Sequence, residues 1–293
     1  MKILKHGLLA TALITTSAFT CTIDGLEGIL PENDMKIEVN AKRFGGISEE
    51  QFNKTIDKVE TLYMPIVGTY GGTLQVVRKW TDATVNAYAE QSGKIWKVSM
   101  FGGLARHETI TEDGFALVVC HEIGHHIGGA PLYSWKDSVN AGWAATEGQS
   151  DYFSTTKCLR RAWLSEDNAT IAAAMEIPQV VKDSCATAWS DANDYNICLR
   201  GAMAGDSVSK LFAALRKQPP GKFETPDAAV VKRTYEGHPA FQCRLDTYFQ
   251  GALCEKAFSE DFTRDSEVAG SCHGTTGQSV GMRPVCWFKP LVQ

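Results

Sequence analysis

The sequence is short of several features that would point to particular classes of protein. Its 29 lysine and arginine residues are outnumbered by 34 aspartate and glutamate residues, which leaves a net charge of −5. Since no basic stripe is present to neutralise phosphates, we expect no nucleic-acid partner. There is no repeat, and no apolar run reaches the roughly 20 residues of a transmembrane helix. With 44% hydrophobic and 22% charged residues, the composition is that of an ordinary globular protein.

The N-terminus has the pattern of an export signal. Lys2 and Lys5 precede an apolar run over residues 8–14, and small residues follow at 15–18. This order is typical of a secretory signal peptide, which we assign to residues 1–20. Cleavage after Ala18 is one option, and a lipid anchor at Cys21 is another. The sequence therefore predicts an exported protein that is periplasmic, outer-membrane-associated or secreted, with no transmembrane segment in the mature chain.

The remaining cysteines are even in number and none stand in Cys-x-x-Cys spacing, which argues against a zinc ribbon. They are Cys120, Cys158, Cys185, Cys198, Cys243, Cys254, Cys272 and Cys286. Export and an even count favour disulfides over metal-binding thiolates. Sequence does not determine the connectivity. Our working hypothesis joins Cys120 to Cys158 across two helices and makes three local loops, Cys185–Cys198, Cys243–Cys254 and Cys272–Cys286.

Local patterns predict an α+β fold, with a small antiparallel sheet followed by many helices. A capping box at residues 48–51 begins the first helix. Strands are expected at 73–80, 84–89 and 94–100, the last two as a hairpin. Helices are expected at about 113–127 and 144–164, and residues 178–217 are mostly helical.

The break at Pro219-Pro220-Gly221 is the clearest along the chain. We divide the sequence after the signal peptide into an irregular lead-in, residues 21–47, and one domain, residues 48–293. The C-terminal part of this domain, residues 222–293, is rich in cysteine and loops, and we expect disulfides to staple it.

The most informative segment is His121-Glu122-Ile123-Gly124-His125. Positions four apart lie on one face of a helix, so His121 and His125 can bind the same Zn²⁺ ion. Glu122 lies about 100° around the helix, where it can take a proton from zinc-bound water. The alternative without a metal is that both histidines are structural residues of a helix and one of them is hydrogen-bonded in the core. His126 points away from His125, and we expect it to have a structural role.

A catalytic zinc ion needs a third protein ligand and an open position. A third histidine on the same turn is excluded because Pro131 stands at its position. Glu147, 147 − 125 = 22 residues after His125, can supply a carboxylate from the next helix. Asp151 follows at i+4 and can orient a ligating histidine through a hydrogen bond. The alternative for both acids is a solvated helix face.

Four segments together resemble the gluzincin metallopeptidases of the CAAX prenyl-protease and heat-shock membrane-protease family. The segments are Val85–Ala89 with Gly93-Lys94-Ile95 and Gly103-Leu104, the helix His121–His125, Glu147–Ser154, and His238–Leu245. They follow the family's order: a strand pair, H-E-x-x-H, E-x-x-x-D and His-Pro-x-x-x-x-Arg. The resemblance implies that the small antiparallel sheet packs on a mainly helical core of the zincin metallopeptidase type. It also implies one catalytic Zn²⁺ ion, a soluble exported member of the family, and a substrate that is an extended polypeptide.

The resemblance also assigns roles to further residues. His238 would donate a hydrogen bond to the oxyanion, with Arg244 as an orienting or substrate-contacting partner; His273 and His107 are weaker alternatives. Asn86 would contact the substrate main chain. If strand 94–100 lies at the sheet edge, its backbone near Ile95 could pair with the substrate; otherwise it is an ordinary packed strand.

The expected function is therefore an exported zinc-dependent endopeptidase with Glu122 as the general base that deprotonates zinc-activated water. The main alternative is a non-catalytic exported zinc-binding protein that serves envelope assembly or binding. A serine or cysteine hydrolase ranks last, since we identify no Gly-x-Ser-x-Gly nucleophile elbow and expect the cysteines to be paired.

Overall fold

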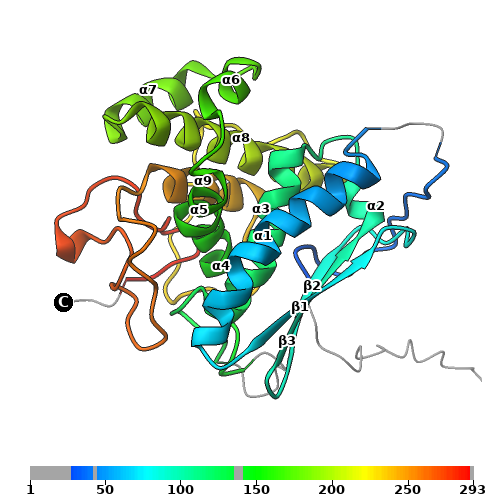
Figure 1. Ribbon diagram of the computed structural model, residues 1–293. Helices are drawn as coiled ribbons and strands as arrows, with labels where there is room; N and C mark the ends of the chain where they lie inside the picture. Colours follow the sequence, from blue (N-terminus) through cyan, green and yellow to red (C-terminus); the bar gives the residue numbers. More distant parts are fainter. Residues whose placement is uncertain (1–27, 42–44, 135–140, 291–293) are drawn as a thin grey trace, which may run out of the picture.

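The computed structural model describes residues 28–41, 45–134 and 141–290. The predicted signal peptide at 1–20 and the candidate anchor Cys21 lie outside the described residues. Within the described ranges, no helix combines the length and the apolar character needed to cross a membrane. A small sheet lies on one side of a mainly helical body and the C-terminal loops lie on the other (Figure 1). This arrangement confirms the α+β prediction.

The helices begin with α1, whose capping box is the predicted one: Ser48 and Gln51 exchange hydrogen bonds of 3.2 and 2.9 Å. α1 continues past Pro65 to Thr69. In chain order the helices are α1 Glu49–Thr69, α2 Gly102–Ala105, α3 Glu112–Ile127, α4 Glu147–Phe153, the π-helix η1 Ser154–Cys158, α5 Leu159–Trp163, α6 Asn168–Ala173, α7 Gln179–Ala188, α8 Ala192–Leu215, α9 Phe241–Leu253 and the 3₁₀-helix η2 Gly274–Thr276. The helix expected at 144–164 is thus the continuous run α4–η1–α5, which begins at Glu147.

The sheet is mixed rather than wholly antiparallel. Its strands β1 (Thr73–Lys79), β2 (Ala87–Ser92) and β3 (Ile95–Phe101) lie in the order β1-β3-β2. β2 and β3 form the predicted antiparallel hairpin, whose turn includes Gly93 at φ +56°. β1 and β3 are parallel, because the chain returns to the sheet through β2 on the far side of β3. β3 is therefore the central strand of these three. The edge position on which substrate pairing near Ile95 depended is not met, and the alternative of an ordinary packed strand holds.

The lead-in pairs with the segment that leads into β2. Ile37 donates its amide to Ala83 O at 2.9 Å, and Ile29 donates to Ala87 O at 3.1 Å, with a Lys36–Thr84 bridge between them. Residues 29–37 thus run antiparallel to residues 83–87, so this part of the lead-in is integrated with the sheet.

Four disulfides join the eight cysteines. Cys120–Cys158 and Cys185–Cys198 are the predicted pairs. The other two predicted pairs are wrong: the bonds are Cys243–Cys286 and Cys254–Cys272. The chain beyond α9 folds back along that helix. Cys286 therefore meets Cys243 in the first turn of α9, and Cys272 meets Cys254 at the end of the helix. Local pairing fails because long-range packing brings distant cysteines together.

Candidate metal centre

Two imidazoles project from one face of α3, the central helix of the body. Thr111 caps this helix by accepting the Gly114 amide at 3.0 Å. The residues from Asp113 to His126 are all buried, so the helix is enclosed on every face. His121 Nε2 and His125 Nε2 lie 3.1 Å apart, as the four-residue spacing predicts.

The second ring nitrogen of each histidine faces an acceptor. His125 Nδ1 lies 2.8 Å from the carbonyl oxygen of Ala145, and His121 Nδ1 lies 2.8 Å from Asp151 Oδ1. Because these oxygens accept and do not donate, both Nδ1 atoms carry the proton. The Nε2 lone pairs are therefore left to face one shared point, as they do in metal-binding histidines.

The charges around the two rings differ. Burial lowers the pKa of His125 to about 4, against the opposing pull of Glu147, so this ring is neutral at pH 7. Burial also disfavours the charged form of His121, but Asp151 and Glu147 outweigh it and raise its pKa to about 9. Without a cation, His121 thus places a proton in the shared space, where a metal ion would replace it.

Glu147, the first residue of α4, completes the group from a second helix. Its Oε2 lies 3.3 Å from His121 Nε2, and its Oε1 lies 3.5 Å from His125 Nε2. One ligand atom from each of the three side chains lies within 4.8 Å of the other two, a spacing that a single bound ion can bridge. Oε2 has no hydrogen-bond partner although it is buried. The three side chains can therefore hold a metal ion.

The Glu147 carboxylate is ionised in this setting. Burial raises its pKa, but His238, His125 and His121 outweigh burial and hold the pKa below the usual range. Tyr133 donates its hydroxyl to Glu147 Oε1 at 3.2 Å. Sequence reasoning missed Tyr133, which lies between the two ligand-bearing helices and carries no spacing signal.

Behind His121 lies a buried ion pair. Arg244 of α9 donates Nε and Nη2 to the two oxygens of Asp151 at 2.8 and 2.7 Å. Tyr248 donates its hydroxyl to Asp151 Oδ1 at 2.7 Å. Asp151 thus stands where the prediction puts it, one helical turn from Glu147 and against His121. Tyr248 was missed, although its i+4 spacing from Arg244 could have indicated it.

Glu122 is buried beside the metal ligands, and neither of its carboxylate oxygens has a hydrogen-bond partner. Burial raises its pKa to about 8, although the His121 charge opposes this. Without a cation beside it, this carboxyl therefore holds its proton at pH 7. A metal ion bound at the neighbouring ligands would favour the ionised form, which can accept a proton from a small polar molecule in the site.

Three further residues that the sequence singled out come from distant segments. His238 Nε2 lies 3.5 Å from Glu147 Oε2 and 2.7 Å from Gly28 O. Asn86 is 1% exposed and hydrogen-bonds the main chain of Leu30. Ile95 is 43% exposed at the start of β3, where it pairs with Thr73 and Ser92.

The other candidates bond elsewhere. His107 and His273 contact the hydroxyls of Thr109 and Thr275 at 3.0 and 2.7 Å. His126 stacks between Trp96 and Trp143, which fits its expected structural role. Asp227, Cys243 and Cys286 also cluster, but the two cysteines form a disulfide and offer no thiolate.

One serine motif went unnoticed in the sequence reasoning. Gly277-Gln278-Ser279-Val280-Gly281 has the Gly-x-Ser-x-Gly spacing of a nucleophile elbow. In the structure this segment is an exposed loop after η2, and the strand-to-turn-to-helix context that such an elbow requires is not found there. Ser279 is therefore an ordinary loop residue.

Comparisons with models of protein families, with curated proteins and with solved structures found no match.

Proposed function

We propose that the protein is an exported zinc-dependent endopeptidase of the gluzincin type, in the family that its motifs resemble. The observation that carries this proposal is the convergence of His121, His125 and Glu147 from two helices, with Glu122 buried beside them and unpartnered. Within the described residues the cluster offers three protein donors, the number found in catalytic zinc sites with an open position. Four disulfides fit export to an oxidising compartment.

In peptide hydrolysis, different residues of the chain would move the proton, stabilise the oxyanion and orient a ligand. Zinc, when bound, supplies a Lewis acid that acidifies water and polarises the substrate carbonyl. Glu122 accepts the proton of the attacking water and later delivers it to the leaving amine. His238, adjacent to the ligand cluster, donates to the developing oxyanion. Asp151, held by Arg244 and Tyr248, keeps His121 in the tautomer and orientation that present Nε2.

The test compares metal content with hydrolysis in the purified chain. The wild type should bind about one zinc ion per molecule, cleave casein, and lose this activity to a chelator. Glu122→Gln should keep the metal and lose activity by about 10²–10⁴-fold, because general base catalysis is worth that much. Glu50→Gln, an exposed change on α1, is the matched control and should be fully active.

Full activity in Glu122→Gln would refute the mechanism. If the zinc-loaded wild type cleaves no peptide and a metal-bound structure shows a fourth protein ligand, the alternative of a non-catalytic exported zinc-binding protein replaces this proposal.

A further inference from the structure

The main chain of Gly28, Ile29 and Leu30 is fully engaged beside the metal centre. Gly28 O accepts from His238 Nε2 at 2.7 Å, and Ile29 O accepts from Arg244 Nη1 at 2.6 Å. Ile29 N donates to Ala87 O at 3.1 Å. Leu30 N donates to Asn86 Oδ1 at 3.1 Å, and Leu30 O accepts from Asn86 Nδ2 at 3.0 Å. Five consecutive polar groups of the backbone are thus satisfied, as in a bound peptide.

The residues that engage this segment are those that the catalytic proposal needs. His238 lies 3.5 Å and Arg244 lies 3.6 Å from the same oxygen of Glu147, so the carbonyls of Gly28 and Ile29 approach the ligand cluster. None of these main-chain contacts depends on the identity of the side chains at 29 and 30. This mode of recognition suits a peptide backbone of any sequence.

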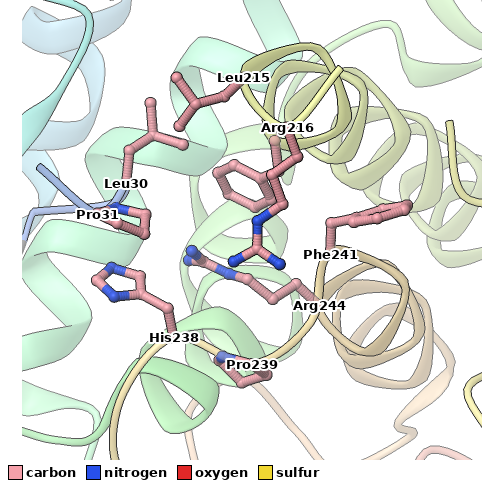
Figure 2. Close-up of a pocket in the computed structure, with 9 residues that line it drawn as sticks. Leu30, Pro31, Leu215, Arg216, His238, Pro239, Phe241 and Arg244 are labelled. Carbon is pink, nitrogen blue, oxygen red and sulfur yellow. The ribbon is translucent and has the colours of Figure 1, made fainter. Parts of the chain in front are cut away.

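Side chains of the segment border a pocket at the same place. Leu30 and Pro31 form one wall, and Phe212, Leu215 and Phe241 contribute apolar surface. Figure 2 shows the His238 ring beside Pro31, with the Arg244 guanidinium group pointing toward the same side of the pocket. Ile29 and Leu30 are 0% and 1% exposed, so the segment fills the space it lies in.

We propose that Gly28–Leu30 occupies, in cis, the groove that binds the main chain of a peptide substrate, and so competes with other peptides for access to the metal centre. This inference rests on the proposed function for the identity of the groove. The segment is a covalently linked competitor, so its effective concentration is high and a peptide in trans binds only to the small open fraction. Freeing the segment should therefore expose the groove.

The fit at Gly28 provides a way to loosen the segment. A Cβ atom there would lie 2.0 Å from Ala87 O and 2.5 Å from Asn86 Oδ1, so Gly28→Ala cannot keep the present contacts. Gly68→Ala is the matched control, because a Cβ at Gly68 meets nothing within 4 Å. Both changes are made in a Glu122→Gln background, so that the binding measurement does not depend on hydrolysis.

The probe is a fluorescein-labelled peptide with the sequence of residues 26–33, measured by fluorescence anisotropy. Gly28→Ala should bind it at least about 10-fold more tightly than Gly68→Ala does, because a larger open fraction raises the apparent affinity. The same peptide with valine in place of its glycine should bind more weakly. Equal binding by Gly28→Ala and Gly68→Ala would overturn the proposal.

A second measurement keeps the native residues of the segment and their packing contacts. A site for a specific protease is inserted at the turn between Asn40 and Ala41, and the folded chain is cut there. The cut chain should bind the probe at least about 10-fold more tightly than the uncut chain, since the competitor is no longer tethered. A folded, cut chain that binds no better than the uncut one would also overturn the proposal.

Casein cleavage by the zinc-loaded chain, with Glu122 intact, separates this inference from the proposed function. Probe binding that rises on cutting, without any hydrolysis, would contradict the peptidase and leave the occupied groove standing. If the uncut chain cleaves casein at the same rate as the cut chain, the occupied groove would be contradicted and the peptidase would be left standing.

Discussion

The helices that carry the candidate metal ligands and the C-terminal loops are built in contrasting ways. α3 is a capped helix enclosed by its neighbours, and its ligands follow from helical spacing. Residues 255–290 contain only the short helix η2 among the described elements, and disulfides tie this stretch to α9. Nevertheless the loops contact α4: Arg283 donates to Gln149 at 2.7 Å, and Trp287 packs on Gly148. The irregular part thus supports the helix that carries Glu147.

The difference shows that the positions of the metal ligands depend on two kinds of support. Regular helix packing and a buried ion pair position His121 and Asp151. Disulfides and loop contacts position the outer side of α4. Each kind of support can be removed separately by substitution.

The largest effect is expected from the buried ion pair. Arg244→Met leaves the Asp151 carboxylate buried and without its main counter-charge, which should lower the free energy of unfolding by about 3–5 kcal/mol. Arg78→Met is the control: Arg78 pairs with Asp57 and Glu60 at the surface, where ion pairs contribute at most about 1 kcal/mol. Urea unfolding followed by circular dichroism measures both. Similar losses in the two variants would mean that the buried pair is not a main support of the site.

The next effect concerns the disulfides of the two regions. Loop closure over 43 residues predicts about 4 kcal/mol for Cys243–Cys286, and closure over 13 residues predicts about 3 kcal/mol for Cys185–Cys198. The double alanine variant of the first pair should also be cut by trypsin within residues 255–285 at least 10-fold faster, since the loops lose a tether. The double variant of the second pair should show no such acceleration. Equal cleavage in both would show that α9 holds the loops without this bond.

The smallest effect tests the junction between the regions. Lys157 lies in η1 and donates to Ala257 O at 2.7 Å. Burial, with Arg160 adding to it, lowers its pKa from 10.5 to about 7. Between these two values the unfolded chain binds more protons than the folded chain, so the Lys157 contribution to stability rises with pH from 7 to 10.5.

The measurement is the difference in unfolding free energy between the wild type and Lys157→Met at pH 7 and pH 10. This difference should shift in favour of the wild type by about 1–3 kcal/mol on going to pH 10, since a pKa difference of one corresponds to about 1.4 kcal/mol and pH 10 does not span the whole interval. A shift of the opposite sign would mean that the lysine stays charged in the folded protein.

Sequence reasoning was most successful where neighbours along the chain decide the structure. The capping box of α1, the hairpin turn at Gly93 and the pairing of His121 with His125 each depend on a few consecutive residues. It left open whether β3 is an edge strand or a central one, and it was wrong about two of four disulfides; both depend on how distant segments pack. It did not foresee that Asn86 binds the chain's own Leu30.

The sequence alone determined the helix that presents two imidazoles to one point, because 3.6 residues per turn put positions 121 and 125 on one face. It also determined that a carboxylate at 147 and another at 151 share a face. Only the tertiary structure decided that Glu147 lies within 3.5 Å of both imidazoles, and that residues 28–30 lie against His238 and Arg244. Helical periodicity is local, whereas these approaches depend on the packing of segments up to 215 residues apart.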